Sequence, residues 1–215
     1  MKCVFVGDAA PNFQAETSQG SIDFHQFIEG KWAVLFSHPK DFTPVCTSEL
    51  GRVAQLKKEW EKRDVKVIAL SCDSVDSHKS WIKDIEELHK CQVFYPIIAD
   101  EDRSVAMTYG MLDAESRGAE LPLTVRSLFV IDPSKRIKLI LTYPASTGRN
   151  FDELLRAIDS LQLTSKHKLA TPADWKRGEQ CVIAPTMSDD EAREQYPGFT
   201  KLKPYLRMTK DPVAA

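Results

Sequence analysis

Four short apolar runs along the chain are spaced and bounded in the way that buried strands are. They cover residues 32–36, 65–70, 127–131 and 137–141, and a segment of turn composition, 132–136, joins the last two. A short, nearly continuous apolar run is typical of a strand that is covered on both faces of its sheet. The pattern therefore predicts four central strands.

Between these runs, apolar residues recur at the three- and four-residue spacing of a helix. This spacing covers roughly residues 44–62, 77–89, 103–109 and 151–161. Strands that alternate with helices predict an α/β layer structure. Beyond residue 163 the chain becomes polar and is interrupted by prolines. We therefore expect one domain over residues 1–169 and a C-terminal arm or small subdomain over residues 170–215.

The charge balance limits the partners that we expect. The 215 residues include 29 Lys and Arg against 31 Asp and Glu, a net charge of −2, with no long block of like charge. Nucleic acid and anionic membranes select basic patches, so neither is expected as a partner. The chain has neither a run of about 18 apolar residues nor the apolar core of a signal peptide. We expect a cytoplasmic protein.

The five cysteines are scattered along the chain, at Cys3, Cys46, Cys72, Cys91 and Cys181. An odd number without CxxC spacing argues against a disulfide framework and against a zinc site of that kind. Free thiols in a reducing compartment fit this pattern. We expect no metal and no cofactor.

Cys46 is the cysteine whose surroundings suggest chemistry. Cysteine reacts as the thiolate, and its ordinary pKa of about 8.5 leaves it mostly protonated near neutrality. Thr43 is a good N-cap and Pro44 suits the first helical position, so Cys46 would lie in the first turn of a helix. Unpaired N–H groups and the positive end of the helix dipole favour an anion there. An inert role stays open, because Cys46 shares a helical face with Leu50 and free cysteines usually pack as small hydrophobes.

The segment around Cys46 resembles the active-site signature of the peroxiredoxins. Pro39, Thr43 and Cys46 stand in the spacing Pro-x-x-x-Thr-x-x-Cys, and the string 37–47 is similar to the one-cysteine branch of that family. The resemblance extends over nearly the whole chain, through residues 8–13, 126–133, 143–150 and 171–175. It implies an α/β, thioredoxin-like peroxidase domain with a central mixed sheet flanked by helices, followed by a C-terminal extension.

The resemblance also implies an activity, the thiol-dependent reduction of hydrogen peroxide and organic hydroperoxides to water and alcohols. Cys46 would be the peroxidatic cysteine and would pass through a sulfenic acid. Thr43 would hydrogen-bond the thiolate and the peroxide, and Pro39 would shield the sulfur from water. Arg126 would lie beside the sulfur, where its guanidinium would stabilise the thiolate.

The resemblance implies supporting roles in the active site for three further residues, and each of them also has a simpler structural interpretation. His38 would lie close to the sulfur, although a histidine at the end of an apolar strand is often a hydrogen-bonded core group. Glu49 and Arg149 would be partners of the reactive group, although a solvated ion pair is the simpler interpretation. For Arg126 itself, the alternative is a surface cation at the start of a strand.

The sulfenic acid must return to the thiol through a second cysteine of the chain or through an external thiol. The two-cysteine branch carries its resolving cysteine in a Val-Cys-Pro context, whereas here Val182 and Ile183 follow Cys181. We favour an external thiol of the glutathione or thioredoxin type and keep resolution by Cys181 as an alternative. The resemblance further implies a homodimer or a higher oligomer.

Three other functions are weighed against a peroxidase. A redox-sensing chaperone or holdase is the alternative of a different class. A disulfide reductase is disfavoured because Cys46 has no partner at CxxC spacing. Relatives in the mammalian branch are described as phospholipases with a Gly-x-Ser-x-Gly motif, but residues 29–33 contain no serine, although His25 is present. We therefore predict no serine-dependent phospholipase activity.

Overall fold

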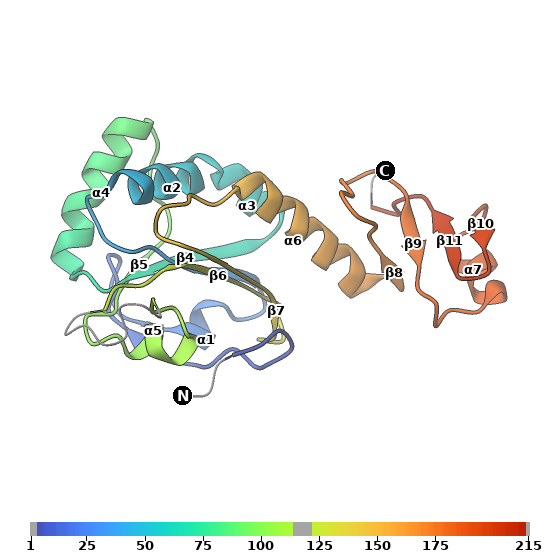
Figure 1. Ribbon diagram of the computed structural model, residues 1–215, viewed down its shortest axis with the longest axis horizontal. Coiled ribbons are helices and arrows are strands. Elements are labelled where there is room, and N and C mark those ends of the chain that lie inside the picture. Colours follow the sequence, from blue (N-terminus) through green and yellow to red (C-terminus); the bar gives the residue numbers. More distant parts are fainter. Residues whose placement is uncertain (1–3, 114–121, 214–215) are drawn as a thin grey trace. The chain divides into compact units, whose positions relative to one another are not determined.

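The structure, a computed structural model, describes residues 4–113 and 122–213. The chain divides into two compact units, Met1–Arg149 and Asn150–Ala215. Figure 1 shows the elements of each unit in chain order. Among the described residues, none of the helices is both long enough and apolar enough to span a bilayer.

The first unit is built on a five-stranded sheet in the order β5-β4-β3-β6-β7. β3 pairs in parallel with β4, β4 pairs in parallel with β5, and β6 and β7 run antiparallel. The strands are β3 Trp32–Ser37, β4 Val65–Ser71, β5 Ile97–Ala99, β6 Arg126–Ile131 and β7 Ile137–Tyr143. The predicted mixed central sheet is confirmed, and the short strand β5 joins the four strands that the sequence predicts.

Both faces of β3 are covered, because every residue of this strand is buried. Ala33 and Leu35 belong to an apolar cluster with Phe24 and Tyr109. The opposite face carries Phe36, whose ring packs on Tyr95 at 6.0 Å between centroids. Figure 1 shows the helices in two layers, α2 Pro44–Gln55, α3 Lys57–Lys62 and α4 Val75–His89 on one side of the sheet and α1 Phe24–Phe27 and α5 Ser104–Tyr109 on the other. A small hairpin, β1 Gln14–Ala15 with β2 Ile22–Asp23, precedes α1.

Three helix boundaries differ from the sequence prediction. The single helix expected over residues 44–62 is wrong, because Leu56 leaves the helical conformation (φ −83°, ψ 13°) and separates α2 from α3. α4 begins before the expected residue 77, because the Ser74 side chain accepts a hydrogen bond from the backbone N–H of Ser77 and caps the helix. The helix expected over 151–161 continues as α6, Phe151–Lys166.

The second unit contains α6 and a four-stranded antiparallel sheet in the order β10-β11-β9-β8. Ser188 and Glu191 form a reciprocal capping box at the start of its short helix. A separate apolar core includes Leu163, Trp175 and Cys181. The elements after α6 are β8 Leu169–Ala170, β9 Cys181–Ile183, α7 Asp189–Gln195, β10 Thr200–Lys203 and β11 Leu206–Thr209.

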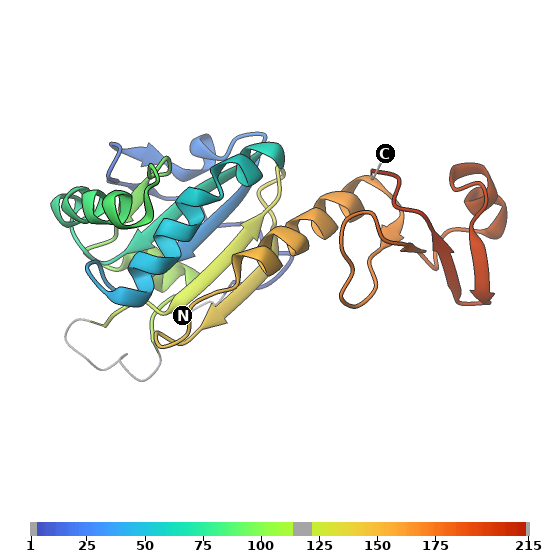
Figure 2. The ribbon, with the colours of Figure 1, turned by 90° about the horizontal axis from the view of Figure 1, so that it is seen from above.

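The compact units divide after Arg149, whereas the sequence becomes polar beyond residue 163 and predicts a boundary between residues 169 and 170. The physical reason is that α6 packs on β8 and belongs by its contacts to the second unit. The domain boundary between residues 169 and 170 stays a prediction about which segment folds independently. Figure 2 shows α6 in orange as the long helix that precedes the strands of the second unit.

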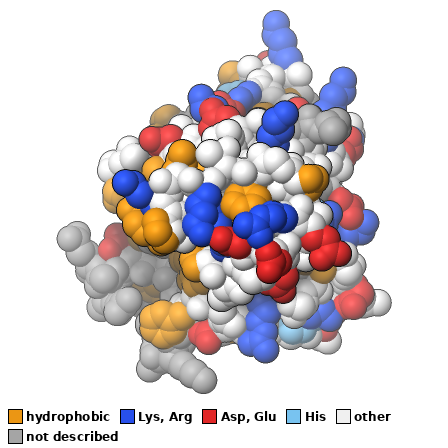
Figure 3. Space-filling model, turned by 90° about the vertical axis from the view of Figure 1, so that its right-hand side faces the viewer, with side chains coloured by type: hydrophobic (Ala, Val, Ile, Leu, Met, Phe, Trp, Pro, Cys, Tyr) orange, Lys and Arg blue, Asp and Glu red, His pale blue; other side chains and the backbone are white. Residues whose placement is uncertain are grey.

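The face of the molecule in Figure 3 mixes charges of both signs. Lys and Arg side chains stand beside Asp and Glu side chains, and apolar groups lie between them. A basic stripe, which proteins use to bind nucleic acid, is not visible on this face.

Candidate active site

Cys46 lies in the first turn of α2, just beyond the loop that follows β3. Thr43 is the N-cap of this helix, with extended backbone angles (φ −118°, ψ 147°), and Pro44 is its first residue. The predicted position of Cys46 at a helix start is therefore confirmed. Its side chain has 0% exposure. The free N–H groups of the first turn and the helix dipole make this a place that favours an anion.

The side chain of Thr43 makes a different contact from that of an ordinary N-cap. Its hydroxyl donates to the carbonyl oxygen of Lys40 at 2.8 Å and makes no capping hydrogen bond. The carbonyl oxygen of Thr43 accepts from the backbone N–H and the hydroxyl of Thr47, at 2.9 and 2.8 Å. Pro39, in the same loop, is buried. The loop is thus held by its own hydrogen bonds at the entrance to α2.

Arg126 is the charged group nearest to the sulfur among the contacts of the described residues. It is the first residue of β6, is 2% exposed, and places Nη1 3.5 Å from the Sγ of Cys46. Its Nε and Nη2 donate to the carbonyl oxygen of Ala145, at 3.0 and 2.6 Å. The surface-cation interpretation of Arg126 is wrong, because the side chain is buried and its guanidinium is fixed from two sides.

Glu49 links Arg126 to a second arginine. Its Oε2 accepts from Arg126 Nη1 at 2.8 Å and from Arg149 Nη2 at 2.7 Å. Its Oε1 accepts from the backbone N–H and the Nε of Arg149, at 2.7 and 2.8 Å. Since Glu49 is 3% and Arg149 8% exposed, the solvated ion pair is also wrong.

The charges of this buried group do not cancel. Burial by itself would raise the pKa of Glu49, but the hydrogen bonds and the charge of Arg149 bring the pKa below its ordinary value. Glu49 is therefore ionised, and together with Arg126 and Arg149 it leaves one net positive charge beside Cys46. The guanidinium of Arg126 presents this positive charge to the Cys46 sulfur.

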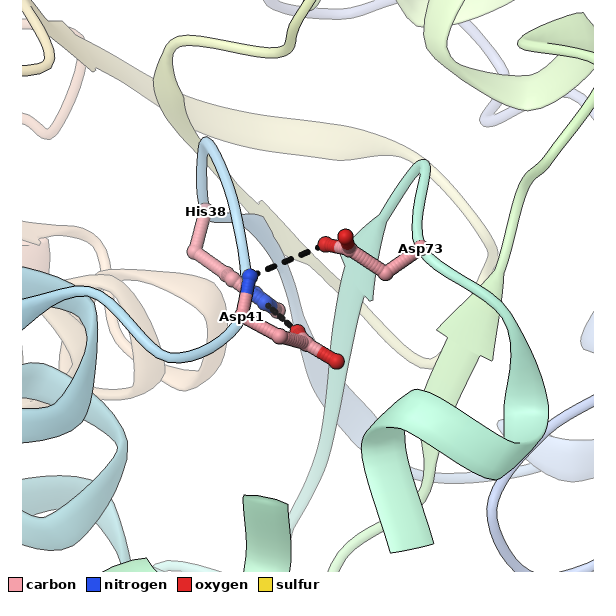
Figure 4. A group of neighbouring side chains, drawn as sticks. All are labelled: His38, Asp41 and Asp73. Carbon is pink, nitrogen blue, oxygen red and sulfur yellow. Dashed lines mark hydrogen bonds and ion pairs between the residues drawn. The ribbon is translucent and has the colours of Figure 1, made fainter. Parts of the chain in front are cut away.

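His38 belongs to a second buried network, shown in part in Figure 4. Its Nε2 lies 2.8 Å from Oδ1 of Asp41. The other oxygen of Asp41 accepts from Nδ1 of His78 at 2.7 Å and from the hydroxyl of Ser77 at 2.8 Å. The backbone N–H of Asp41 donates to Asp73 at 2.9 Å. The sequence pattern did not predict Asp41 or His78 as partners of His38, although Asp41 lies within the signature segment only three positions away.

Possible metal-ligand atoms of His38, Asp41 and Asp73 lie within 4.8 Å of one another. The facing oxygens, however, already accept hydrogen bonds: those of Asp41 from histidines, and that of Asp73 from a backbone N–H and from the hydroxyl of Ser71. The arrangement is therefore explained as a hydrogen-bond network.

The other described cysteines lack features that activate a thiol. Burial raises the pKa of Cys72 and of Cys181 to about 11, and it also raises the pKa of Cys91. Cys181 has 0% exposure in the core of the second unit. These thiols are poor nucleophiles near neutral pH. Cys3 lies outside the described residues.

A thioredoxin-like mixed sheet that holds a buried cysteine at a helix start, next to a guanidinium group, defines a cysteine-dependent oxidoreductase. Comparison with known proteins identifies the family within this class. Residues 6–140 match the AhpC/TSA family, and residues 160–198 match the C-terminal domain of 1-Cys peroxiredoxin. A 1-Cys peroxiredoxin of Dictyostelium discoideum is 52% identical over 208 residues, which are 96% of this chain and 85% of the relative.

Two solved structures are similar over nearly their full length. A cysteine-to-serine mutant of the peroxiredoxin 6 of Arenicola marina has a TM-score of 0.93 at 48% identity, covering 98% of this chain and 99% of that one. A yeast mitochondrial 1-Cys peroxiredoxin, whose thiol is resolved via glutathione and thioredoxin systems, has a TM-score of 0.91 at 48% identity, covering 96% and 99%. The chain belongs to the peroxiredoxin family, in its one-cysteine subgroup, and is a thiol peroxidase.

Proposed function

We propose that Cys46 is the peroxidatic cysteine of this thiol peroxidase and that Thr43, Pro39 and Arg126 form its catalytic surroundings. The observation that carries the proposal is the 3.5 Å approach of Arg126 Nη1 to the Cys46 sulfur at the start of α2. The other described cysteines have raised pKa values, so they are less suited to react.

In the proposed reaction, the Cys46 thiolate attacks one oxygen of a hydroperoxide. A sulfur–oxygen bond forms, the oxygen–oxygen bond breaks, and the products are a sulfenic acid and an alkoxide or hydroxide that takes a proton from solvent. Arg126 stabilises the thiolate and then the negative charge that develops on the leaving oxygen. Its hydrogen bonds to Ala145 hold the guanidinium in place before the peroxide arrives.

Thr43 and Pro39 have complementary roles in this proposal. Since the Thr43 hydroxyl donates its proton to Lys40, its lone pairs are left to accept the O–H of a peroxide. Pro39 is buried and has no N–H, so it covers the sulfur without competing as a donor. Glu49 and Arg149 support the site by holding Arg126 in position.

We propose that an external thiol of the glutathione or thioredoxin type reduces the sulfenic acid. Attack by a thiolate on the Cys46 sulfenic acid gives a mixed disulfide and hydroxide, and a second thiol then releases Cys46. Support comes from the yeast mitochondrial relative, whose thiol is resolved via these systems. The buried Cys181, whose pKa is raised to about 11, makes resolution within the chain less favourable.

A homodimer and a cytoplasmic location are further parts of the proposal. β7 pairs with β6 on one side. On its other side Ile137 exchanges backbone hydrogen bonds with Gly7 and Asp8, next to an isolated bridge between Ala9 and Arg136, and no other strand among the described residues pairs there. An edge with unpaired backbone groups is a template for a second copy. The scattered free cysteines fit a reducing compartment such as the cytoplasm.

The test measures peroxide consumption by the purified protein with a thiol donor. Cys46→Ser is expected to abolish turnover, and Cys181→Ser, the matched control, is expected to retain it. Mass spectrometry after one equivalent of peroxide and of thiol should find a mixed disulfide at Cys46. Undiminished turnover in Cys46→Ser would overturn the proposal. A redox-sensing holdase would instead show Cys46 oxidation no faster than that of a free thiol.

A further inference from the structure

The hydrogen bonds around Asp41 determine which ring nitrogens of His38 and His78 carry a hydrogen. His78 has 0% exposure, and its Nε2 lies 3.1 Å from the carbonyl oxygen of Ile98. A carbonyl oxygen only accepts, so this nitrogen carries a hydrogen. The other nitrogen, Nδ1, faces the carboxylate of Asp41 at 2.7 Å.

The carboxylate of Asp41 is ionised, so the proton in this contact belongs to His78. Burial by itself would raise the pKa of Asp41, but hydrogen bonds from His38 and His78 hold the pKa well below its ordinary value. With hydrogen on both ring nitrogens, His78 is an imidazolium. It forms a buried ion pair with Asp41 whose charges cancel.

The charge balance then determines the state of His38. Its Nε2 donates to Oδ1 of Asp41 at 2.8 Å. His78 already neutralises the carboxylate of Asp41. Burial is the largest influence on the pKa of His38 and lowers it, although the carboxylates of Asp41 and Asp73 act in the opposite direction. His38 is therefore neutral with its hydrogen on Nε2, and Nδ1 is a bare acceptor.

Nδ1 of His38 is the one buried side-chain polar atom without a hydrogen-bond partner within residues 4–113 and 122–213. A buried acceptor without a donor costs stability comparable to a lost hydrogen bond. The ring cannot easily turn to relieve this, because Asp41 holds its Nε2 and the indole of Trp81 packs against it with 5.1 Å between centroids. The same indole donates to the hydroxyl of Thr47, the residue after Cys46, at 3.2 Å.

We propose that Asp41 and His78 are positioning residues for the peroxidase reaction, an ion pair that keeps His38 neutral with Nδ1 free to accept a hydroxyl hydrogen. The acceptor serves a hydroxyl that the reaction brings to the site, either the O–H of the peroxide or that of the sulfenic acid. This inference rests on the proposed role of Cys46. It assigns a role to the unsatisfied atom and to the charged pair of His78 on α4 and Asp41 in the loop before α2, which does not belong to the Arg126 group.

The test compares His78→Gln with Ser77→Ala. Both remove a hydrogen bond to the same oxygen of Asp41, but only His78→Gln removes the positive charge. Nitrogen NMR of histidine-labelled, reduced protein at pH 7 should show two protonated nitrogens on His78 and a bare Nδ1 on His38 in the wild type and in Ser77→Ala. In His78→Gln, His38 should gain a proton on Nδ1.

Stopped-flow oxidation of Cys46 by hydrogen peroxide gives the second readout. The rate constant should fall about tenfold in His78→Gln and stay within about twofold of wild type in Ser77→Ala. A wild-type His38 with hydrogen on Nδ1 would overturn the inference, and this measurement needs no variant to fold. Equal rates in both variants would overturn it as well. Failure of Cys46 to react in the wild type would instead count against the proposed function.

Discussion

Replacing Glu49 by glutamine tests the buried charge group most directly. The carboxylate accepts four N–H groups, three from Arg149 and one from Arg126, two at each oxygen. Glutamine has nearly the same shape but offers one acceptor oxygen. Whichever way the amide points, two buried donors lose their acceptor and two guanidinium groups lose their counter-charge.

The expected loss of stability follows from these contacts. Each unsatisfied buried donor costs about 1–3 kcal/mol, so two cost roughly 2–6 kcal/mol. Removing one partner of a buried salt bridge costs about 3–5 kcal/mol, which agrees with this range. We therefore expect Glu49→Gln to lower the free energy of unfolding by about 4 kcal/mol at pH 7. With a urea slope of about 2–3 kcal/mol/M, the midpoint should fall by about 1.3–2 M.

Acid pH should remove the difference between the two proteins. The pKa of Glu49 in the folded protein is lowered from its ordinary value of 4.5, so its contribution is present above pH 4.5 and is lost as the pH falls through the folded value. Wild type and variant should therefore converge in stability below pH 4.5.

Urea unfolding followed by tryptophan fluorescence would measure these differences. Glu59→Gln is the matched control, because Glu59 pairs with Arg63 but its side chain is 43% exposed. It should change the stability by less than about 1 kcal/mol. If Glu49→Gln were no more destabilising than Glu59→Gln at pH 7, the buried charge group would not stabilise the fold as described.

Three further predictions concern packing, resolution and capping. Gly51→Ala should destabilise the protein by about 1–3 kcal/mol, because a Cβ there would overlap the ring of His89, whereas Gly148→Ala meets only an ordinary contact and should be tolerated in thermal denaturation. Cys181→Ser should keep its thiol-dependent peroxidase rate, and a loss of turnover that added thiol does not restore would establish Cys181 as the resolving cysteine. Ser188→Ala should cost about 1 kcal/mol by removing the capping box of α7, and hydrogen exchange that is unchanged at the start of that helix would contradict this.

The central sheet was predictable because its inner strands are covered on both faces. Burial is complete along β3 and β6 and nearly complete along β4, whereas β7 is half-buried; the mainly apolar runs near Trp32, Val65, Ser127 and Ile137 all stand out in the sequence. The strands of the second unit did not stand out. β8 has 2 residues and β9 has 3, which is too short for any periodicity to show.

The part of the site that lies in one short sequence segment was predictable, whereas contacts between residues far apart in the sequence were not predictable from the local pattern. The segment from Pro39 to Cys46 is local, so its helix start could be derived from capping preferences. The proximity of Arg126 to the sulfur came from the family resemblance, since 80 positions separate the two in sequence. His78 had neither kind of signal, because only the packing of α4 beside the loop brings it to Asp41.

Because Cys46 is completely buried, the size of a peroxide or thiol affects whether it can reach the sulfur. A hydroperoxide is small enough to reach the sulfur after minor side-chain movements. A thiol on a peptide or protein must bring its own sulfur into contact with that of Cys46, so we expect the first turn of α2 to open before it reacts. The free energy of that opening depends on how firmly α2 is tied to its neighbours. Glu49 ties α2 to Arg149, so we expect its hydrogen bonds to slow this opening and, with it, the reduction of the oxidised enzyme by large thiols.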